Sequence, residues 1–311
     1  MQILKLLFAL AISMSALGLF PSSVLAANES QRSAENSVAN ECVVLQWDKK
    51  GYNKPYLPIR SPGKYCIDQD YQFDCYPWSH GCGGNFIDIR SNDVDVDFRG
   101  HTVSVSGTRA YTAVWGFGKN IRIHNGTIKG LGIGISLRHR DGSAKSPVYA
   151  YPANPVETSP TFGITSFYVE DMIFNDVQRP ILLSGSGNII RHNDITVVLK
   201  NPDSDDSKSS EEDESRVALL NYGPKALIEN NKIIQQMDGM RLPTYSIYVR
   251  HSNNSVIKNN QIRIDGSEHA IAIGLSASHG VVIEQNKIFG AQTSVERTSE
   301  SSASESAGEA N

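Results

Sequence analysis

Short apolar runs with one recurring polar interruption dominate the chain from residue 86 onward. The clearest copy of this phrase places Ile257, Asn260 and Ile262 in order. All copies share an apolar first position, namely Phe98, Ile123, Val169, Ile190, Ile228, Ile257 and Ile283. Five residues later each is apolar again, at Val103, Ile128, Phe174, Ile195, Ile233, Ile262 and Ile288. Between them stand His101, Gly126, Met172, Asn193, Asn231, Asn260 and Asn286. The return of asparagine in phase predicts a repeat architecture.

The phrase predicts two short strands that meet at a bend. Asparagine tolerates the left-handed backbone conformation that such a bend requires, and stacked asparagines can hydrogen-bond along the stack. A second kind of strand precedes each copy, over Phe86–Arg90, Tyr111–Trp115, Ile181–Ser184, Val217–Asn221, Ser246–Arg250 and Ala270–Leu275. Three strands per repeat of about 21 to 29 residues indicate a parallel β-helix, whereas an antiparallel sandwich gives the asparagine no reason to recur. The interval between Ile123 and Val169 is longer and fits either two coils or one coil with an insertion.

One stretch carries a family resemblance. The run from Asn92 to Val103, with alternating valine and aspartate before Arg99-Gly100-His101-Thr102, resembles the entry coil of right-handed parallel β-helices of the pectin-lyase-like superfamily. The turn and strand Pro62–Cys66 resemble the segment upstream of that coil. The resemblance covers about residues 42–290. It implies an all-β fold, a right-handed single-stranded parallel β-helix with a disulfide-stapled N-terminal cap, and it implies little about activity because this fold carries many functions.

Residues 1–26 have the features of a cleaved signal peptide. An apolar run, Leu6–Phe20, follows Lys5, and small residues precede Ala27. A membrane anchor is the alternative, but the run is shorter than the roughly 20 residues that span a bilayer. We therefore expect a secreted or periplasmic protein with no integral membrane segment in the mature chain.

The remaining chain divides by composition. Residues 27–41 are polar and predict a flexible N-terminus. Residues 42–85 combine cysteines, aromatic residues and turn residues, and we expect them to cap the β-helix domain 42–290. The loop 200–216 is rich in Asp, Glu and Ser and has the composition of a solvated loop. The tail 291–311 is of low complexity and predicted to be disordered.

All four cysteines, Cys42, Cys66, Cys75 and Cys82, lie in the predicted cap. Export permits disulfides. Three pairings can be drawn, and we favour Cys42–Cys66 with Cys75–Cys82 because short-range links would staple a local cap. A zinc site including His80 is the alternative, but the spacing matches no standard zinc pattern, so we expect no metal at these cysteines.

Charge is unevenly distributed. The net charge is -4, with hydrophobic residues at 40% and charged residues at 20%. Because the acidic residues concentrate in the loop and the tail, the predicted folded body is mildly basic. A mean hydropathy of -0.30 argues against a polytopic membrane protein. No glycine-rich nucleotide-binding loop is present, and we expect no nucleic-acid partner.

Two groups of residues suit a saccharide. The loop 138–160 holds Arg138, Arg140 and Tyr149, and guanidinium groups pair with carboxylate or sulfate while aromatic rings stack on sugars. The alternative is a solvated loop stiffened by its prolines.

The second group lies on and before a predicted strand and comprises Asp238, Arg241, Tyr248, Arg250 and His251. By strand alternation Tyr248 and Arg250 share the outward face, as do Asp88 and Arg90 on the first coil. Asn221 matches Arg250 one coil earlier, so we expect an outward ladder of Arg90, Asn221, Tyr248 and Arg250. A solvated sheet face is the alternative.

Catalytic signatures are faint. Met240-Arg241-Leu242-Pro243 resembles the Arg-x-Pro element of pectate lyases, without their second arginine or calcium-binding aspartates. Ser278-His279-Gly280 contains the His-Gly of galacturonan hydrolases, without the paired aspartates that their chemistry needs. Calcium could bind the acidic loop, although no glycine-punctuated ligand spacing is present.

We therefore expect an exported β-helix protein that binds polysaccharide. If it is an enzyme, the favoured chemistry is that of a lyase or epimerase on uronate-type polymers rather than that of a hydrolase. The alternative is a non-catalytic carbohydrate-binding, adhesion or envelope scaffold protein.

Overall fold

The computed structural model describes residues 42–47, 56–75, 84–107, 111–139, 164–200, 217–238, 243–266, 269–298 and 303–305. All of them belong to one compact unit, Cys42–Asn311. The predicted signal peptide and flexible N-terminus lie outside the described residues, as do the acidic residues 201–216.

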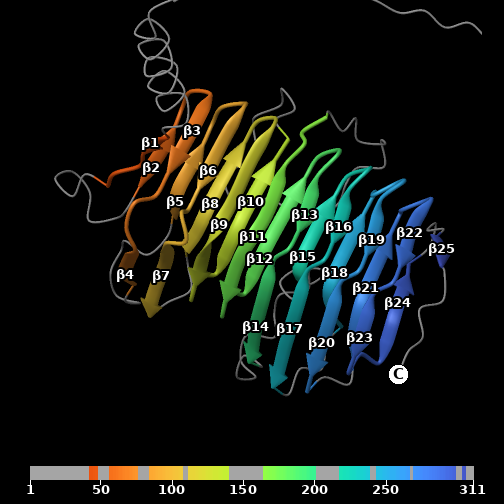
Figure 1. Ribbon diagram of the computed structural model, residues 1–311. Helices are drawn as coiled ribbons and strands as arrows, with labels where there is room; N and C mark the ends of the chain where they lie inside the picture. Colours follow the sequence, from red (N-terminus) through yellow and green to blue (C-terminus); the bar gives the residue numbers. More distant parts are fainter. Residues whose placement is uncertain are drawn as a thin grey trace, which may run out of the picture. The chain divides into compact units, whose positions relative to one another are not determined.

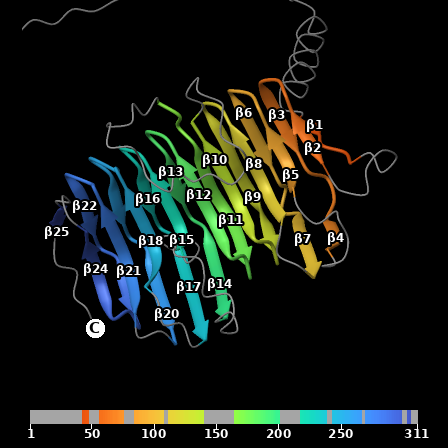
Figure 2. The same ribbon diagram turned by 180° about the vertical axis from the view of Figure 1, so that it is seen from behind.

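The described residues form two parallel sheets (Figures 1 and 2). Sheet 1 contains β1 (Val43–Val44), β3 (Gly63–Cys66), β4 (Tyr71–Cys75), β6 (Val94–Asp97), β7 (Thr102–Gly107), β9 (Ile121–Lys129), β11 (Tyr168–Asn175), β13 (Ile189–Arg191), β14 (Asp194–Lys200), β16 (Leu227–Glu229), β17 (Lys232–Asp238), β19 (Val256–Lys258), β20 (Gln261–Asp265), β22 (Val281–Glu284), β23 (Lys287–Phe289) and β25 (Ala303–Glu305). Sheet 2 contains β2 (Leu57–Ile59), β5 (Gly84–Ile89), β8 (Tyr111–Phe117), β10 (Ile133–Arg138), β12 (Arg179–Ser184), β15 (Val217–Tyr222), β18 (Thr244–Arg250), β21 (Ala270–Ser276) and β24 (Thr293–Arg297).

Successive coils stack strand upon strand (Figure 1). One coil runs through β16 and β17 of sheet 1 and then β18 of sheet 2, and each strand pairs in parallel with its counterpart in the next coil. This arrangement confirms the predicted parallel β-helix and excludes the antiparallel sandwich. Within the described part of the chain, no helix combines the length and the apolar character needed to cross a membrane.

The bend between the two strands of the phrase lies one residue earlier than predicted. Within the phrase, the residue that precedes the ladder position has positive φ, as at Asn125, Asp171, His192, Asn230, Asn259 and Gln285. The prediction that the ladder asparagine itself adopts the left-handed conformation is therefore wrong. Its side chain must point into the stack to reach the neighbouring coils, so the preceding residue absorbs the bend.

The ladder asparagines form a continuous chain of hydrogen bonds. The Nδ2 atoms of Asn193, Asn231 and Asn260 each donate to Oδ1 of the asparagine in the next coil, at 2.9 Å in all three cases. Each Nδ2 also donates to a backbone carbonyl of the preceding coil, as Asn260 does to Ile228 at 3.0 Å. Buried polar groups require such partners, so the asparagine repeat has a structural cause.

The apolar columns pair as predicted, with one exception. Ile123 pairs with Val96 rather than with Phe98, because the turn at Arg99 and Gly100 lengthens the first copy. Phe98 is still fully buried. It lies against Gly126, where a β-carbon would approach the Phe98 β-carbon to 2.1 Å. The first copy thus fills the ladder space with a phenyl ring instead of an amide.

The predicted cap takes the form of a coil where it is described. Strands β2, β3 and β4 pair with β5, β6 and β7, so this segment extends both sheets. The Cys42–Cys66 disulfide is confirmed, with Cα atoms 5.7 Å apart. Cys82 lies outside the described residues, so the Cys75–Cys82 pairing stays a prediction.

Two further boundaries are settled by strand pairing. Strand β9 pairs directly with β11 and β10 with β12, so the long interval after Ile123 is one coil with an insertion. The predicted domain end at residue 290 is too early, because β24 adds a strand to sheet 2 and Val295 extends the row of Ile273.

We predict that Asn260→Ala lowers the free energy of unfolding by about 3 kcal/mol, because it leaves the buried Asn231 amide and Ile228 carbonyl without their partner. Urea denaturation followed by circular dichroism measures the loss. The matched control is Asn175→Ala, at an exposed strand position, for which we expect a change below about 0.5 kcal/mol. Equal stability of the two variants would contradict the structural role of the ladder.

Candidate functional site

The outer face of sheet 2 carries two rows of side chains that run across the coils. One row is Asp88, Trp115, Ser136, Leu182, Leu220, Tyr248, Gly274 and Glu296. The other is Phe117, Arg138, Ser184, Tyr222, Arg250 and Ser276. Arg90 follows Ile89, which pairs with Gly116, so Arg90 is level with Phe117. Aromatic and arginine side chains thus share this face. The second row is partly exposed, whereas Asp88, Ser136, Leu182 and Leu220 of the first row are buried.

Three members of the predicted outward ladder lie on this face, in two different rows. Tyr248 belongs to the first row, whereas Arg90 and Arg250 belong to the second. Arg138 joins the second row, in register with Phe117 and Ser184. The face was therefore predicted correctly, but the alignment of its members was not.

The predicted place of Asn221 in this ladder is wrong. Asn221 pairs with Val249 rather than with Arg250, so it points inward, and it is fully buried. There it belongs to a second internal chain of hydrogen bonds. Asn188 Nδ2 donates to Asn221 Oδ1 at 2.9 Å, and Asn221 Nδ2 donates to Ser252 Oγ at 3.0 Å. A register error of one residue moved a core amide to the predicted surface.

Other predicted site residues lie outside the described part of the chain. These are Arg140, Tyr149 and Arg241. His251 is described and lies at the end of β18, with its ring centroid 5.3 Å from that of Tyr222. Burial and the neighbouring Arg250 lower the pKa of His251 below its ordinary value, which favours the neutral ring.

A buried carboxylate anchors the N-terminal part of this face. Asp88 accepts hydrogen bonds from Tyr56 Oη at 2.5 Å, Arg60 Nη2 at 2.9 Å and Arg90 Nε at 3.2 Å. Burial by itself would raise the pKa of Asp88, but these hydrogen bonds outweigh it and lower the pKa below its ordinary value. Arg90 is held over the ring of Trp115, 5.8 Å from its centroid. The carboxylate therefore orients the arginine.

Aromatic side chains cover the C-terminal part of the same face. The rings of Tyr245 and Tyr248 lie 4.7 Å apart, and Tyr245 Oη donates to Glu296 Oε2 at 2.8 Å. Gly274 makes room for them, because a β-carbon there would approach both rings to less than 3 Å. Tyr245 and Tyr248 are partly exposed, and such aromatic edges beside arginines suit ligands with both apolar faces and polar groups.

A pocket of 420 Å³ opens where sheet 2 turns toward sheet 1. We call it the corner pocket, and its lining consists of Arg90, Ser91, Asn92, Phe117, Gly118, Lys119 and His139. Arg90, Lys119 and His139 are basic residues, and none of the seven is acidic.

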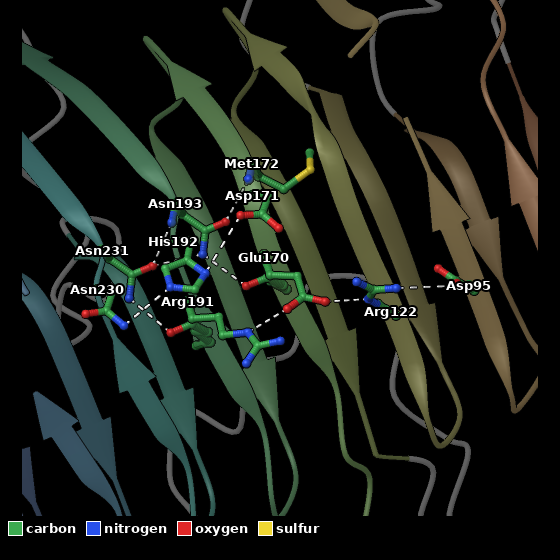
Figure 3. A network of polar contacts seen from close by, with 12 residues as sticks. Asp95, Arg122, Glu170, Asp171, Met172, Arg191, His192, Asn193, Asn230 and Asn231 are labelled. Carbon is green, nitrogen blue, oxygen red and sulfur yellow. Dashed lines mark hydrogen bonds and ion pairs between the residues drawn. The ribbon is translucent and has the colours of Figure 1, made fainter. Parts of the chain in front are cut away.

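A network of charged residues on the outer face of sheet 1 escaped the sequence analysis (Figure 3). One register row there alternates in sign along the stack, through Asp97, His124, Glu170, Arg191, Glu229, Lys258 and Glu284. From His124 onward these are the residues that follow the first apolar column, and Asp97 follows Val96, which takes the place of Phe98 in the register. The alternation was therefore visible in the aligned repeat and was the signal that could have identified them.

Glu170 is the centre of the network. It is almost fully buried and lies between Arg122 and Arg191, each of which donates its Nε to a different carboxylate oxygen (Figure 3). The Arg191 contact measures 2.6 Å, and Arg122 Nη1 lies 3.8 Å from Asp95 Oδ2. Burial raises the pKa of Glu170, but the hydrogen bonds from Arg191 and Arg122 outweigh it and lower the pKa below its ordinary value.

A second pocket, of 490 Å³, lies over this network and is called here the sheet 1 pocket. Its lining comprises Gly63, Lys64, Asp93, Val94, Asp95, Asn120, Arg122, Tyr168, Glu170 and Arg191. The corner pocket uses residues 90–92 and 117–119, and the sheet 1 pocket uses 93–95, 120 and 122. The two pockets therefore lie on the two sides of one corner.

Among the described residues, no group of three or more His, Cys, Asp or Glu side chains is placed to hold a metal ion. The predicted calcium loop, residues 200–216, lies almost entirely outside them.

No protein-family model matches this chain, and no curated protein sequence matches it. Among solved structures, the A-module of mannuronan C-5 epimerase AlgE4 from Azotobacter vinelandii aligns with 78% of this chain and 91% of its own. The identity is 10% and the TM-score is 0.18. A likeness of this extent carries no argument about function, which must be inferred from the two surfaces.

We predict that Glu170→Gln lowers the free energy of unfolding by about 2 kcal/mol at neutral pH, because it removes the buried charge between two arginines. The folded-state pKa of Glu170 is depressed, so this stabilisation is complete above the ordinary pKa of 4.5 and is lost as the pH falls through the folded value. Urea denaturation between neutral and acidic pH should show the variant and the native protein converging.

The control for this experiment is Glu284→Gln, a partly exposed glutamate in the same register row. We expect it to change stability by less than about 0.5 kcal/mol. A Glu170→Gln deficit that is independent of pH would show that the carboxylate charge contributes nothing.

Proposed function

We propose that this protein binds polysaccharide along the outer face of sheet 2. The observation that carries the proposal is the pair of rows in which aromatic residues stand beside arginines, such as Trp115 beside Arg90 and Tyr248 beside Arg250. Sugar rings stack on aromatic faces, and guanidinium groups bind hydroxyl and carboxylate oxygens through their fixed fork of donors.

The geometry of the stack suits a polymer. Neighbouring strands of a sheet are about 4.8 Å apart, so equivalent side chains recur at this interval across the coils. A linear glycan presents similar groups at each sugar unit. Such a chain lying along the partly exposed second row would meet Phe117, Arg138, Tyr222 and Arg250, and its affinity would add over the units.

Export and family membership belong to the same proposal. The Cys42–Cys66 disulfide supports an oxidising compartment, because disulfides are rare in reducing ones. We propose that residues 1–26 direct the chain to the periplasm or the exterior, and that it belongs to the pectin-lyase-like superfamily. The entry-coil sequence Asn92–Val103 supports the latter.

Uronate processing, by a lyase or epimerase reaction, is the second candidate function. Both reactions remove the proton beside a carboxylate, which requires a base and a cation that neutralises the carboxylate. The sheet 1 pocket combines Tyr168 and Lys64, which can accept a proton when deprotonated, with Arg122 and Arg191. Glu170 orients both arginines through their Nε atoms. This arrangement favours an enzyme over a purely adhesive or scaffold protein.

If polysaccharide binds on sheet 2, two matched arginine variants should differ in affinity. Arg250→Ala should weaken binding to polygalacturonate about tenfold, because a charge-assisted contact is lost. Arg263→Ala, on β20 in sheet 1, should leave the affinity unchanged, since Arg263 is paired with Asp265 away from sheet 2. Isothermal titration calorimetry measures both. Equal affinities for the two variants and the native protein would exclude this face as the binding surface.

The second candidate function predicts turnover. Incubation with uronate polymers should produce ultraviolet-absorbing unsaturated ends if a lyase acts, or a changed ratio of uronate epimers by NMR if an epimerase acts. Tyr168→Phe should reduce either rate at least a hundredfold, in line with the loss of a general base. Tyr65→Phe, whose hydroxyl donates to the Ser61 carbonyl, is the control. Absence of both products would leave binding alone as the function.

A further inference from the structure

We propose that the corner pocket binds the acidic group of a saccharide, a carboxylate or a sulfate. This inference rests on the proposed polysaccharide function and names the class of sugar. Its first support is charge. Arg90, Lys119 and His139 line the pocket, and none of the lining residues that the structure describes is acidic. The sheet 1 pocket, by contrast, includes Asp95 and Glu170 beside its arginines, which lower its net positive charge.

Asp88 leaves positive charge available in the corner pocket. This single carboxylate pairs with two guanidinium groups, Arg60 at 2.9 Å and Arg90 at 3.2 Å. One negative charge therefore faces two positive charges. Arg90 is about half exposed while Asp88 is buried, so the guanidinium rather than the carboxylate is offered to a ligand. The anchor holds Arg90 in one orientation, which reduces the entropy lost when a ligand binds.

Lys119 stands on a turn that is firmly packed. Its backbone N–H donates to Asn92 Oδ1 at 2.9 Å. Gly118, with φ of +157°, lies so close to the preceding coil that a β-carbon would approach the Ser91 carbonyl oxygen to 2.2 Å. The turns of two successive coils are thus fixed against each other. The exposed lysine side chain extends from a rigid base, beside Arg90.

His139 closes the third side of the pocket. It directly follows β10, and its backbone N–H donates to the Ser184 carbonyl at 2.8 Å, which continues the strand pairing of sheet 2. Arg138, the residue before it, belongs to the row of Arg250. The corner pocket therefore adjoins the second row of side chains on sheet 2. A polymer on sheet 2 would place one acidic sugar there.

The test compares four probes on the full chain: sodium sulfate, monomeric galacturonate, polygalacturonate and neutral dextran. We expect the native protein to bind the three anionic probes, with polygalacturonate the tightest, and affinities that fall as salt is added. Lys119→Ala should weaken each anionic probe about tenfold. Lys129→Ala, an exposed lysine at the C-terminal end of β9, the strand that follows the Lys119 turn, should change nothing.

The outcomes separate this inference from the function on which it rests. If Lys119→Ala binds all anionic probes as the native protein does, or if the native protein binds none, the corner pocket is not an anion site. Unchanged polygalacturonate affinity in that variant would still leave polymer binding on sheet 2 intact. If sulfate and galacturonate bind through Lys119 but no polymer binds, the corner pocket is an anion site and the proposed polysaccharide function is wrong.

Thermal unfolding of each variant is the control that shows whether the variant is folded. If Lys119→Ala unfolds at a lower temperature than the native protein, the binding measurements use Lys119→Gln instead. Glutamine keeps most of the length of the side chain without its charge. His139→Gln provides an independent second variant. Anion affinity that survives in both glutamine variants would overturn the inference.

Discussion

The buried side-chain amide ladder is the constraint on which the rest of the structure depends. In a stack of parallel strands each coil must lie in register with the next, and a shift of one residue would exchange interior and exterior side chains. The chain of hydrogen bonds through Asn193, Asn231, Asn260 and Asn286 penalises any such shift, because every member would lose partners inside the core. Asn188, Asn221 and Ser252 do the same beside sheet 2.

Because the interior fixes the register, the exterior becomes a regular array. Outward residues of successive coils fall into rows. The residues of one row occupy the same position in each sequence repeat, so that position determines whether the row is charged, aromatic or apolar. On sheet 1 this yields cross-strand pairs of opposite charge, which stabilise neighbouring strands, with Glu170 buried between two arginines. On sheet 2 it yields aromatic and arginine rows. The same register thus produces a face of paired charges on sheet 1 and a face of aromatic and arginine rows on sheet 2.

The fold could be predicted from sequence because its signal repeats. One asparagine says little, but four in phase with two apolar columns indicate stacked coils, and only Phe98 was placed in the wrong column. The site was harder, because it depends on register to the single residue. Asn221 and Tyr222 differ by one position, yet one is buried in the core and the other lies on the sheet 2 face. The partners of Glu170, Arg122 and Arg191, are 48 and 21 residues away, so its burial between them follows only once the coils are stacked in register.

The asparagine ladder also has a direction. Between the side-chain amides, Asn193, Asn231 and Asn260 each donate to the amide of the next C-terminal coil, so the amide dipoles align and polarise one another. A directional chain of this kind cannot be interrupted without separating it into two shorter ones. A coil duplicated into the middle of the stack would therefore be tolerated only if it brought its own asparagine. Beyond Asn286 no such demand applies. Growth or loss of coils over evolution should accordingly concentrate at the C-terminal end, while the corner with its two pockets stays unaltered.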